Sequence, residues 1–181
     1  MKYILLFCIL FSSAWIAGCS SPTIPAVAEQ PFFPVNEMVK WNYSTGNNGT
    51  VNCVWNADNN LTTIDATTYY TVVESYLSAP QHTDTVFYKQ VGDVLYRRIR
   101  GSRDYVIADF SLQLNAVAWW DTSARVTVKD DNTITFATTF GADYGYSISF
   151  KRGVGIVSQI DNGFVYNQLT LVNYAKRAVA K

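Results

Sequence analysis

The sequence predicts a mainly β protein with little helix: a single antiparallel meander that forms a barrel or a strongly curved sheet. Short runs in which apolar and polar residues alternate recur along the chain, as in half-buried strands. Clusters of Gly, Asn and Asp separate these runs at regular spacing and are typical of turns. Aromatic residues make up 15% of the chain and charged residues also 15%, a balance that favours strands over helices.

The first strand is expected from Val39, because Val39, Trp41 and Tyr43 alternate with polar residues. Asp58-Asn59-Asn60 is expected to end the second strand, since such residues favour turns. Segment 116–123 is the least regular, and a short helix is one option there. The further expected strands cover residues 51–55, 67–77, 85–91, 94–100, 105–114, 125–129, 133–139, 144–151, 155–160 and 164–174.

The N-terminal residues have the plan of an export signal. Lys2 is followed by the apolar run Tyr3–Leu10 and then by small and polar residues, and such segments are removed on maturation. The apolar run is too short to suit a transmembrane helix. The signal is closed by Ile16-Ala17-Gly18-Cys19, which resembles a bacterial lipobox. The alternative is an ordinary secretory signal with a chance cysteine.

The lipobox resemblance implies a domain plan and a location. Residues 1–18 are cleaved off after Gly18, and Cys19 becomes the acylated first residue of the mature chain. Residues 19–31 are rich in proline and form a tether, about 40 Å long if extended. Residues 32–174 form the β-rich domain and residues 175–181 a short tail. Ser20 stands where an aspartate would often signal inner-membrane retention, which favours the outer membrane, facing the periplasm.

Charge and cysteine content exclude several classes of protein. Without Lys2, thirteen basic residues face fourteen acidic ones, and near-neutrality argues against nucleic-acid binding. Cys8 leaves with the signal and Cys19 carries the lipid, so Cys53 has no partner for a disulfide within its chain. Cys53 lies two residues from both Val51 and Trp55, and we expect its side chain to be buried.

Two stretches at opposite ends of the domain resemble a known family. Phe32-Phe33-Pro34-Val35-Asn36 precedes Trp41 and Tyr43, and Phe150 precedes Gly153-Val154-Gly155-Ile156-Val157. These stretches are similar to those of a family of small exported bacterial β-proteins, many of them lipoproteins and largely of unknown function. The chain departs from the family at Glu37-Met38, where a glycine is common. The resemblance implies a fold type and no catalytic residue.

Residues typical of catalysis or metal binding are scarce. The single histidine, His82, lies in an expected loop, and no nucleophile motif accompanies it. The count of Cys and His is too low for a zinc site, and the acidic clusters lack the spacing of a calcium loop. We therefore predict no catalytic residue, no metal site and no cofactor, and an enzyme is the less favoured class.

An arginine cluster and a tryptophan pair are the candidate binding residues. Arg97, Arg98, Arg100 and Arg103 crowd one expected strand and its turn. Neighbouring strand residues point to opposite faces, so two arrangements are open. Either this is an edge strand protected by charge, which we prefer, or one face lines a polar cavity that accepts an anionic group.

Trp119 and Trp120 also point to opposite sides if the backbone is extended, which leaves one ring available for stacking. The candidate ligand-binding residues are Trp119, Trp120, Arg98 and Arg100. The function predicted from the sequence is a membrane-anchored envelope lipoprotein that binds a lipid, a glycan or an envelope protein without catalysis. A structural or assembly accessory is the alternative, and a hydrolase with an unrecognised site is a further one.

The lipid anchor gives a first testable prediction. Cys19→Ala is expected to abolish labelling by a fatty-acid analogue in growing cells and to leave the protein unprocessed or soluble, because the acylated thiol is the anchor. Cys8→Ala, in the part of the signal that is removed, is the control and should label normally. If the Cys19 variant stays with membranes and the wild type takes no label, the anchor is not at Cys19.

Overall fold

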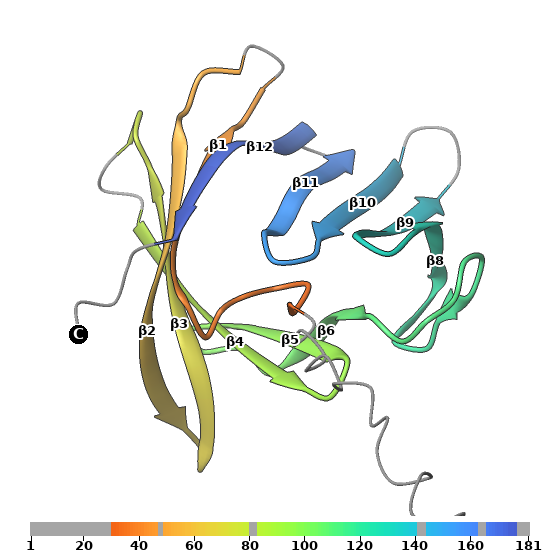
Figure 1. The fold of residues 1–181 in the computed structure, drawn as a ribbon, viewed down its shortest axis with the longest axis horizontal. Coiled ribbons are helices and arrows are strands. Elements are labelled where there is room, and N and C mark those ends of the chain that lie inside the picture. The colour runs from red at the N-terminus through yellow and green to blue at the C-terminus, as the bar shows by residue number, and fades with distance from the viewer. Residues whose placement is uncertain (1–29, 47–48, 80–82, 141–143, 163–165, 177–181) are drawn as a thin grey trace, which may run out of the picture.

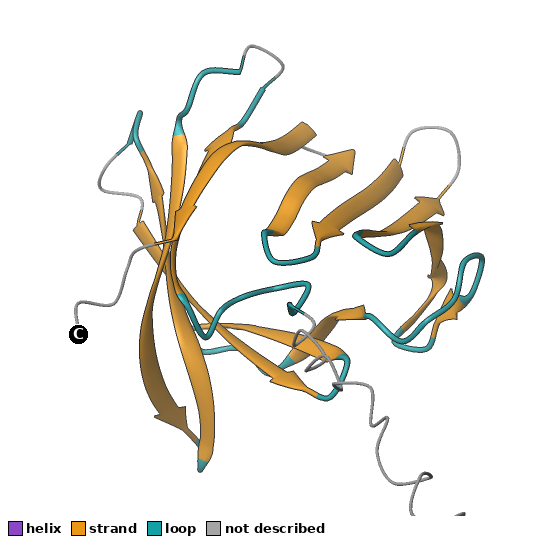
Figure 2. Cartoon of the chain, in the orientation of Figure 1, coloured by secondary structure: helices purple, strands orange, loops and turns teal. Residues whose placement is uncertain are grey.

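The computed structural model describes residues 30–46, 49–79, 83–140, 144–162 and 166–176. The predicted signal, Gly18, Cys19, most of the tether, His82 and residues 177–181 lie outside the described residues. Within the described part every regular element is a strand, as the sequence predicts (Figure 2). Nothing there forms a helix that is both long and apolar enough to cross a membrane.

Twelve strands are found in the described residues. They are β1 (Met38–Ser44), β2 (Cys53–Ile64), β3 (Thr67–Tyr76), β4 (Thr83–Val91), β5 (Val94–Ile99), β6 (Tyr105–Asp109), β7 (Val117–Ala118), β8 (Asp121–Lys129), β9 (Thr133–Phe140), β10 (Tyr144–Lys151), β11 (Gly155–Asn162) and β12 (Tyr166–Lys176).

All strands belong to one antiparallel sheet in which most neighbours are consecutive hairpin partners. Its order is β6-β5-β4-β3-β2-β1-β12-β11-β10-β9-β8-β7, so β6 and β7 are the two edges and β1 pairs with β12. The sheet curls until these edges approach each other, which gives a nearly closed barrel (Figure 1). The predicted meander is therefore confirmed.

The second strand differs from the prediction, because Asp58-Asn59-Asn60 does not end it. β2 continues to Ile64, and Asn59 adopts a φ of 56° where the pairing with β3 shifts between Ala57 and Leu61. The turn is made by Asp65 and Ala66 instead, with φ of 50° and 61°, as in a type I′ hairpin. Asn and Asp favour left-handed backbone in bulges as in turns, so composition alone does not separate the two.

The irregular segment around residue 118 is not helical. It holds the two-residue strand β7 and a turn that contains Trp119 and Trp120. The strand expected to reach Leu114 ends at Asp109, whose Oδ1 accepts hydrogen bonds from the Ser111 backbone N–H at 3.0 Å and the Ser111 hydroxyl at 2.6 Å. This local cap turns the chain before Leu114 is reached.

Large aromatic side chains fill the middle of the barrel. Val39, Trp41 and Tyr43 are at most 2% exposed, as their alternation predicts. The segment that precedes β1, drawn in orange in Figure 1, runs into the space that the strands enclose. Its Phe33 side chain is buried. Its ring lies 5.6 Å from that of Trp41 and 4.9 Å from that of Tyr88, between ring centroids. Residues 30–37 therefore plug the barrel.

The two stretches that carry the family resemblance meet at this plug. The Trp41 indole N–H donates to the Val154 carbonyl, and the Tyr43 hydroxyl donates to the Ile156 carbonyl at 2.9 Å. Gly155 has a φ of 103°, and a Cβ built there would lie 2.8 Å from the Phe33 ring. Only glycine suits this position, because the backbone is strained for other residues and the ring occupies the space.

Replacing Gly155 tests the fit of the plug. Gly155→Ala is expected to lower the free energy of unfolding by about 1–3 kcal/mol more than Gly92→Ala, because only the former meets a packed ring. Gly92 is the matched control, with a φ of 58° and open space around it. Urea denaturation measures both. Equal losses would mean that Phe33 does not pack against Gly155.

Candidate functional site

Two cavities lie within the curved sheet, beside the plug and the aromatic core. The first, here called the apolar chamber, has a volume of about 220 Å³ and takes most of its apolar wall from Val106, Ile107, Trp120, Ile148 and Ile156. The second, the polar chamber, has a volume of about 240 Å³. Its wall includes Thr45, Trp55, Glu74, Tyr76, Asp161 and Gln168. Arg97 and Gln159 line both chambers, which therefore meet at these two side chains.

Arg97 forms an ion pair inside the barrel. Its Nη2 lies 3.2 Å from Oε1 of Glu74, which is only 5% exposed. The preferred sequence interpretation of this arginine strand is wrong, since β5 lies between β4 and β6 and is not an edge. Arg97 fits the alternative interpretation, in which one face of this strand lines a polar cavity.

Burial and charge act against each other in this pair. Burial raises the pKa of Glu74, and the positive charge of Arg97 opposes the rise. For Arg97 burial acts to lower the pKa, but the nearby Tyr88 and Glu74 raise it overall, so the guanidinium stays charged. The site thus contains a buried pair whose stability depends on both partners.

Three buried polar atoms on the chamber walls have no hydrogen-bond partner among the described residues. They are the Trp55 Nε1, the Tyr88 Oη and the Arg97 Nε. Trp55 and Tyr88 are 2% and 0% exposed. Weaker polar contacts still join Arg97 to Tyr88 and Tyr105, and Trp55 to Cys53, but the three atoms make no hydrogen bond of good geometry. Each unpaired buried donor costs about 1–3 kcal/mol, and native proteins contain few of them.

Cys53 is a poor nucleophile. The side chain is fully buried, as predicted, and burial raises the pKa of its thiol to about 11. The thiolate, the reactive form, is therefore scarce at neutral pH. Nor does the described part of the chain contain three His, Cys, Asp or Glu side chains grouped as metal ligands would be.

The two candidate tryptophans point to different surroundings. Trp120 is half-buried, packs on Phe136 and lines the apolar chamber. Trp119 is 58% exposed, lies edge-to-face on Trp120 and donates its indole N–H to Asp109 Oδ2 at 2.9 Å. Since Asp109 ends the edge strand β6, this bond links the two edges of the sheet by side chains.

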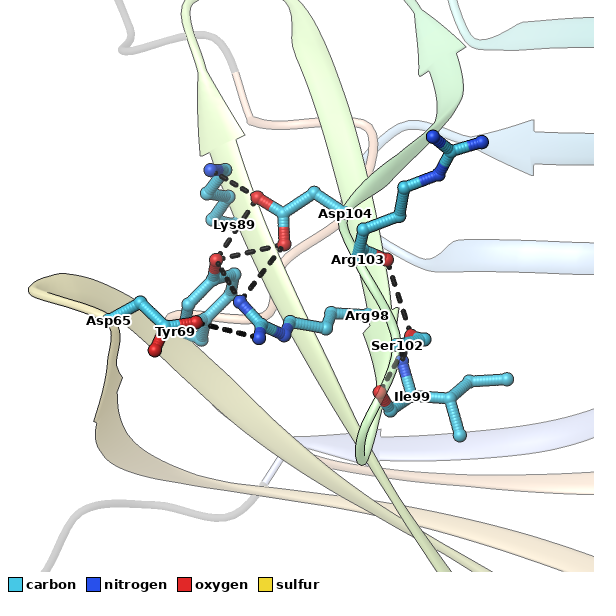
Figure 3. Close-up of polar contacts among 8 residues, drawn as sticks. All are labelled: Asp65, Tyr69, Lys89, Arg98, Ile99, Ser102, Arg103 and Asp104. Carbon is cyan, nitrogen blue, oxygen red and sulfur yellow. Dashed lines mark hydrogen bonds and ion pairs between the residues drawn. The ribbon is translucent and has the colours of Figure 1, made fainter.

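Arg98 lies on the outer face of the barrel, in a network of paired groups (Figure 3). Its Nη2 contacts Asp65 at 2.8 Å, and the buried Tyr69 donates to Asp104 at 2.8 Å. Burial acts to raise the pKa of Asp104, but hydrogen bonds from Lys89 and Tyr69 lower it overall. The network joins the β2–β3 turn to the loop before β6 and satisfies its own charges.

Arg100 follows β5 and is exposed. The structure therefore brings Trp120 together with Arg97, rather than with the candidates Arg98 and Arg100. The sequence analysis did not single out Glu74, Tyr88, Trp55 or Gln159. Glu74 had a usable signal, because it alternates with Val72 and Tyr76 in a strand whose same face is otherwise apolar.

Fold and site together define a plugged, nearly closed β-barrel with a divided internal cavity. No family model matches the chain, and a search of the curated proteins finds no match. The functional argument therefore rests on the residues of the chambers.

The buried ion pair predicts a pH dependence that Glu74→Gln removes. Because the pKa of Glu74 is raised on folding, its contribution favours the folded state at low pH and is lost as the pH rises from the ordinary carboxyl range through the raised value. The unfolding free energy of the wild type, minus that of the variant, should therefore fall across this window. Denaturation at several pH values measures it, and a difference independent of pH would contradict the raised pKa.

Proposed function

We propose that this protein is a membrane-anchored envelope lipoprotein whose barrel binds a small molecule without catalysis. The lipobox with Cys19, the proline-rich tether and Ser20 support an anchor in the outer membrane, with the domain facing the periplasm. The observation that carries the binding proposal is the set of buried donors, the Trp55 Nε1, the Tyr88 Oη and the Arg97 Nε, on the walls of two chambers that share Arg97.

These donors are more consistent with binding than with packing. A barrel interior that served stability alone would gain from apolar residues in their place, because each unpaired buried donor lowers stability. Buried polar groups without partners are expected mainly at functional sites, where a protein keeps them despite their cost in stability. The chambers also combine apolar walls with a few converging polar groups, as ligand sites do.

An assembly role is the second candidate, and Trp119 supports it. The ring is 58% exposed next to β7, an edge of the sheet, and exposed edges can accept a strand from a partner. The bond from Trp119 to Asp109 also fits a role in closing the barrel. An envelope protein lost specifically from Trp119→Ala would favour assembly over small-molecule binding.

Co-purification tests the binding proposal. The full-length lipidated protein is isolated from membranes in polymer discs without detergent, and its bound molecules are identified by mass spectrometry. Gln159→Phe should fill the junction of the chambers and remove the bound molecule. Ile160→Phe is the matched control, because its side chain belongs to the opposite face of β11, and it should retain the molecule.

Folding of both variants is checked by thermal unfolding, so that a loss of ligand is not a loss of fold. A molecule enriched on the wild type and on Ile160→Phe, and absent from a folded Gln159→Phe, supports the proposal. Identical extracts from all three proteins would contradict it.

A further inference from the structure

We infer that the molecule bound in the barrel is an uncharged amphiphile, whose hydrogen-bond acceptors meet the donors around Arg97 and whose apolar part occupies the apolar chamber. The inference rests on the proposed function and adds the chemical class of the ligand. It follows from three properties of the walls: their unpaired donors, their charge balance and their apolar surface.

The three unpaired atoms are hydrogen-bond donors, so a ligand that pairs with them must carry hydrogen-bond acceptors. The Trp55 Nε1 and the Arg97 Nε can only donate, and the Tyr88 hydroxyl can donate as well as accept. Trp55 lines only the polar chamber and Tyr88 only the apolar one, whereas Arg97 lines both. A ligand therefore needs carbonyl, ether or hydroxyl oxygens on both sides of the junction to satisfy all three groups. An apolar ligand would leave them unpaired, and a ligand with donors alone would satisfy at most the hydroxyl.

The charge of Arg97 is already compensated. Glu74 on β3 is its ion-pair partner at 3.2 Å, so an anionic ligand would compete with Glu74 and leave that carboxylate buried without its counter-charge. A cation at the junction would lie beside the guanidinium, at the cost of like-charge repulsion. An uncharged ligand avoids both penalties.

The other groups around the pair do not change this balance. Asp84 and Tyr88 on β4 and Tyr43 on β1 act on the pair electrostatically. On the remaining sides lie Cys53 and Tyr76, which also interact with Glu74, and Tyr105, which interacts with Arg97.

Farther along the chamber walls are two carboxylates. Asp121 accepts hydrogen bonds from the backbone and hydroxyl of Ser123, and Asp161 is exposed. Among the described wall residues, acidic groups thus outnumber the single arginine, and an added negative charge has no unpaired basic group to meet.

The apolar chamber sets the size of the ligand's other part. Its volume of about 220 Å³ lies below the range of about 300–1,000 Å³ that is common for small-molecule sites. Its wall includes Ile148, Ile156 and Val106. A short alkyl chain fits this shape and chemistry.

Three probes of eight carbons each, which differ in the charge of their polar group, test the inference: octanamide, octanoate and octylammonium. Binding to the purified domain is measured by ligand-observed NMR at about pH 8, where all three have a defined charge and an ordinary carboxyl is ionised. Octanamide is expected to bind at least about tenfold more tightly than either charged probe, since its carbonyl meets the donors without a charge penalty.

Tyr88→Phe tests the donor directly. It should weaken octanamide binding by about three- to tenfold, the effect of one hydrogen bond, while the melting temperature stays the same or rises, because a buried hydroxyl without a partner is removed. Tyr96→Phe on β5, which loses a hydroxyl outside both chambers, is the matched control and should change neither.

Glu74→Gln tests the charge balance. The variant leaves Arg97 without its counter-charge, so the wild-type preference for octanamide over octanoate should shrink by at least about tenfold. A melting curve confirms that the variant is folded at the assay temperature.

Tighter binding of octanoate to the wild type would overturn the inference in favour of an acidic ligand, and tighter binding of octylammonium in favour of a basic one. Equal binding of the three probes, or no binding of octanamide at millimolar concentration, would also overturn it. The proposed function depends separately on co-purification, so a molecule lost only from Gln159→Phe and found to be charged would preserve the function and refute the ligand class.

Discussion

The insertion of Phe33 between Trp41, Tyr88 and Phe150 determines how the interior of this barrel is used. A sheet of this size encloses more space than its inward side chains fill unaided, and a segment from outside the sheet supplies the missing volume. Because the plug packs against the aromatic core, the apolar and polar chambers lie beside it rather than in the middle of the barrel. Gly155 makes the insertion possible by leaving room for the ring.

The chambers combine costs that a purely structural interior would avoid. Burial disfavours the charges of Glu74 and Arg97, and their mutual attraction offsets this only while both are present. The outer network around Asp104 shows the opposite arrangement, with Lys89 and Tyr69 satisfying the carboxylate at the edge of solvent. On the outer face of the sheet the polar groups around Asp104 have hydrogen-bond and ion-pair partners, whereas some polar atoms around Arg97 on the inner face have none among the described residues.

Alternation in the sequence was sufficient to predict the fold and the burial of Trp41 and Cys53, because strand residues alternate regardless of what surrounds them. It did not locate the site. Gln159 faces inward only because Val157 is an extra residue in β11, opposite Ser149 and Phe150 of β10, and such shifts leave little trace in composition. Arg97 was recognised as unusual from the sequence. That it lies on an inner strand rather than an edge strand depends on the order of strands in the sheet, which the alternation of residues within each strand does not specify.

The pairing of β1 with β12 has a kinetic consequence. Within the described sheet, every other ladder joins strands that are consecutive in the chain, whereas Val39 pairs with Lys176. The loop-closure entropy of the fold is therefore concentrated in one seam, and non-local pairing is slow to form. The bonds from Trp41 to Val154 and from Tyr43 to Ile156 each join residues that are 113 positions apart, so they too are non-local. We therefore expect the hairpins on either side to form early and the pairing of β1 with β12 to be the slow step of folding.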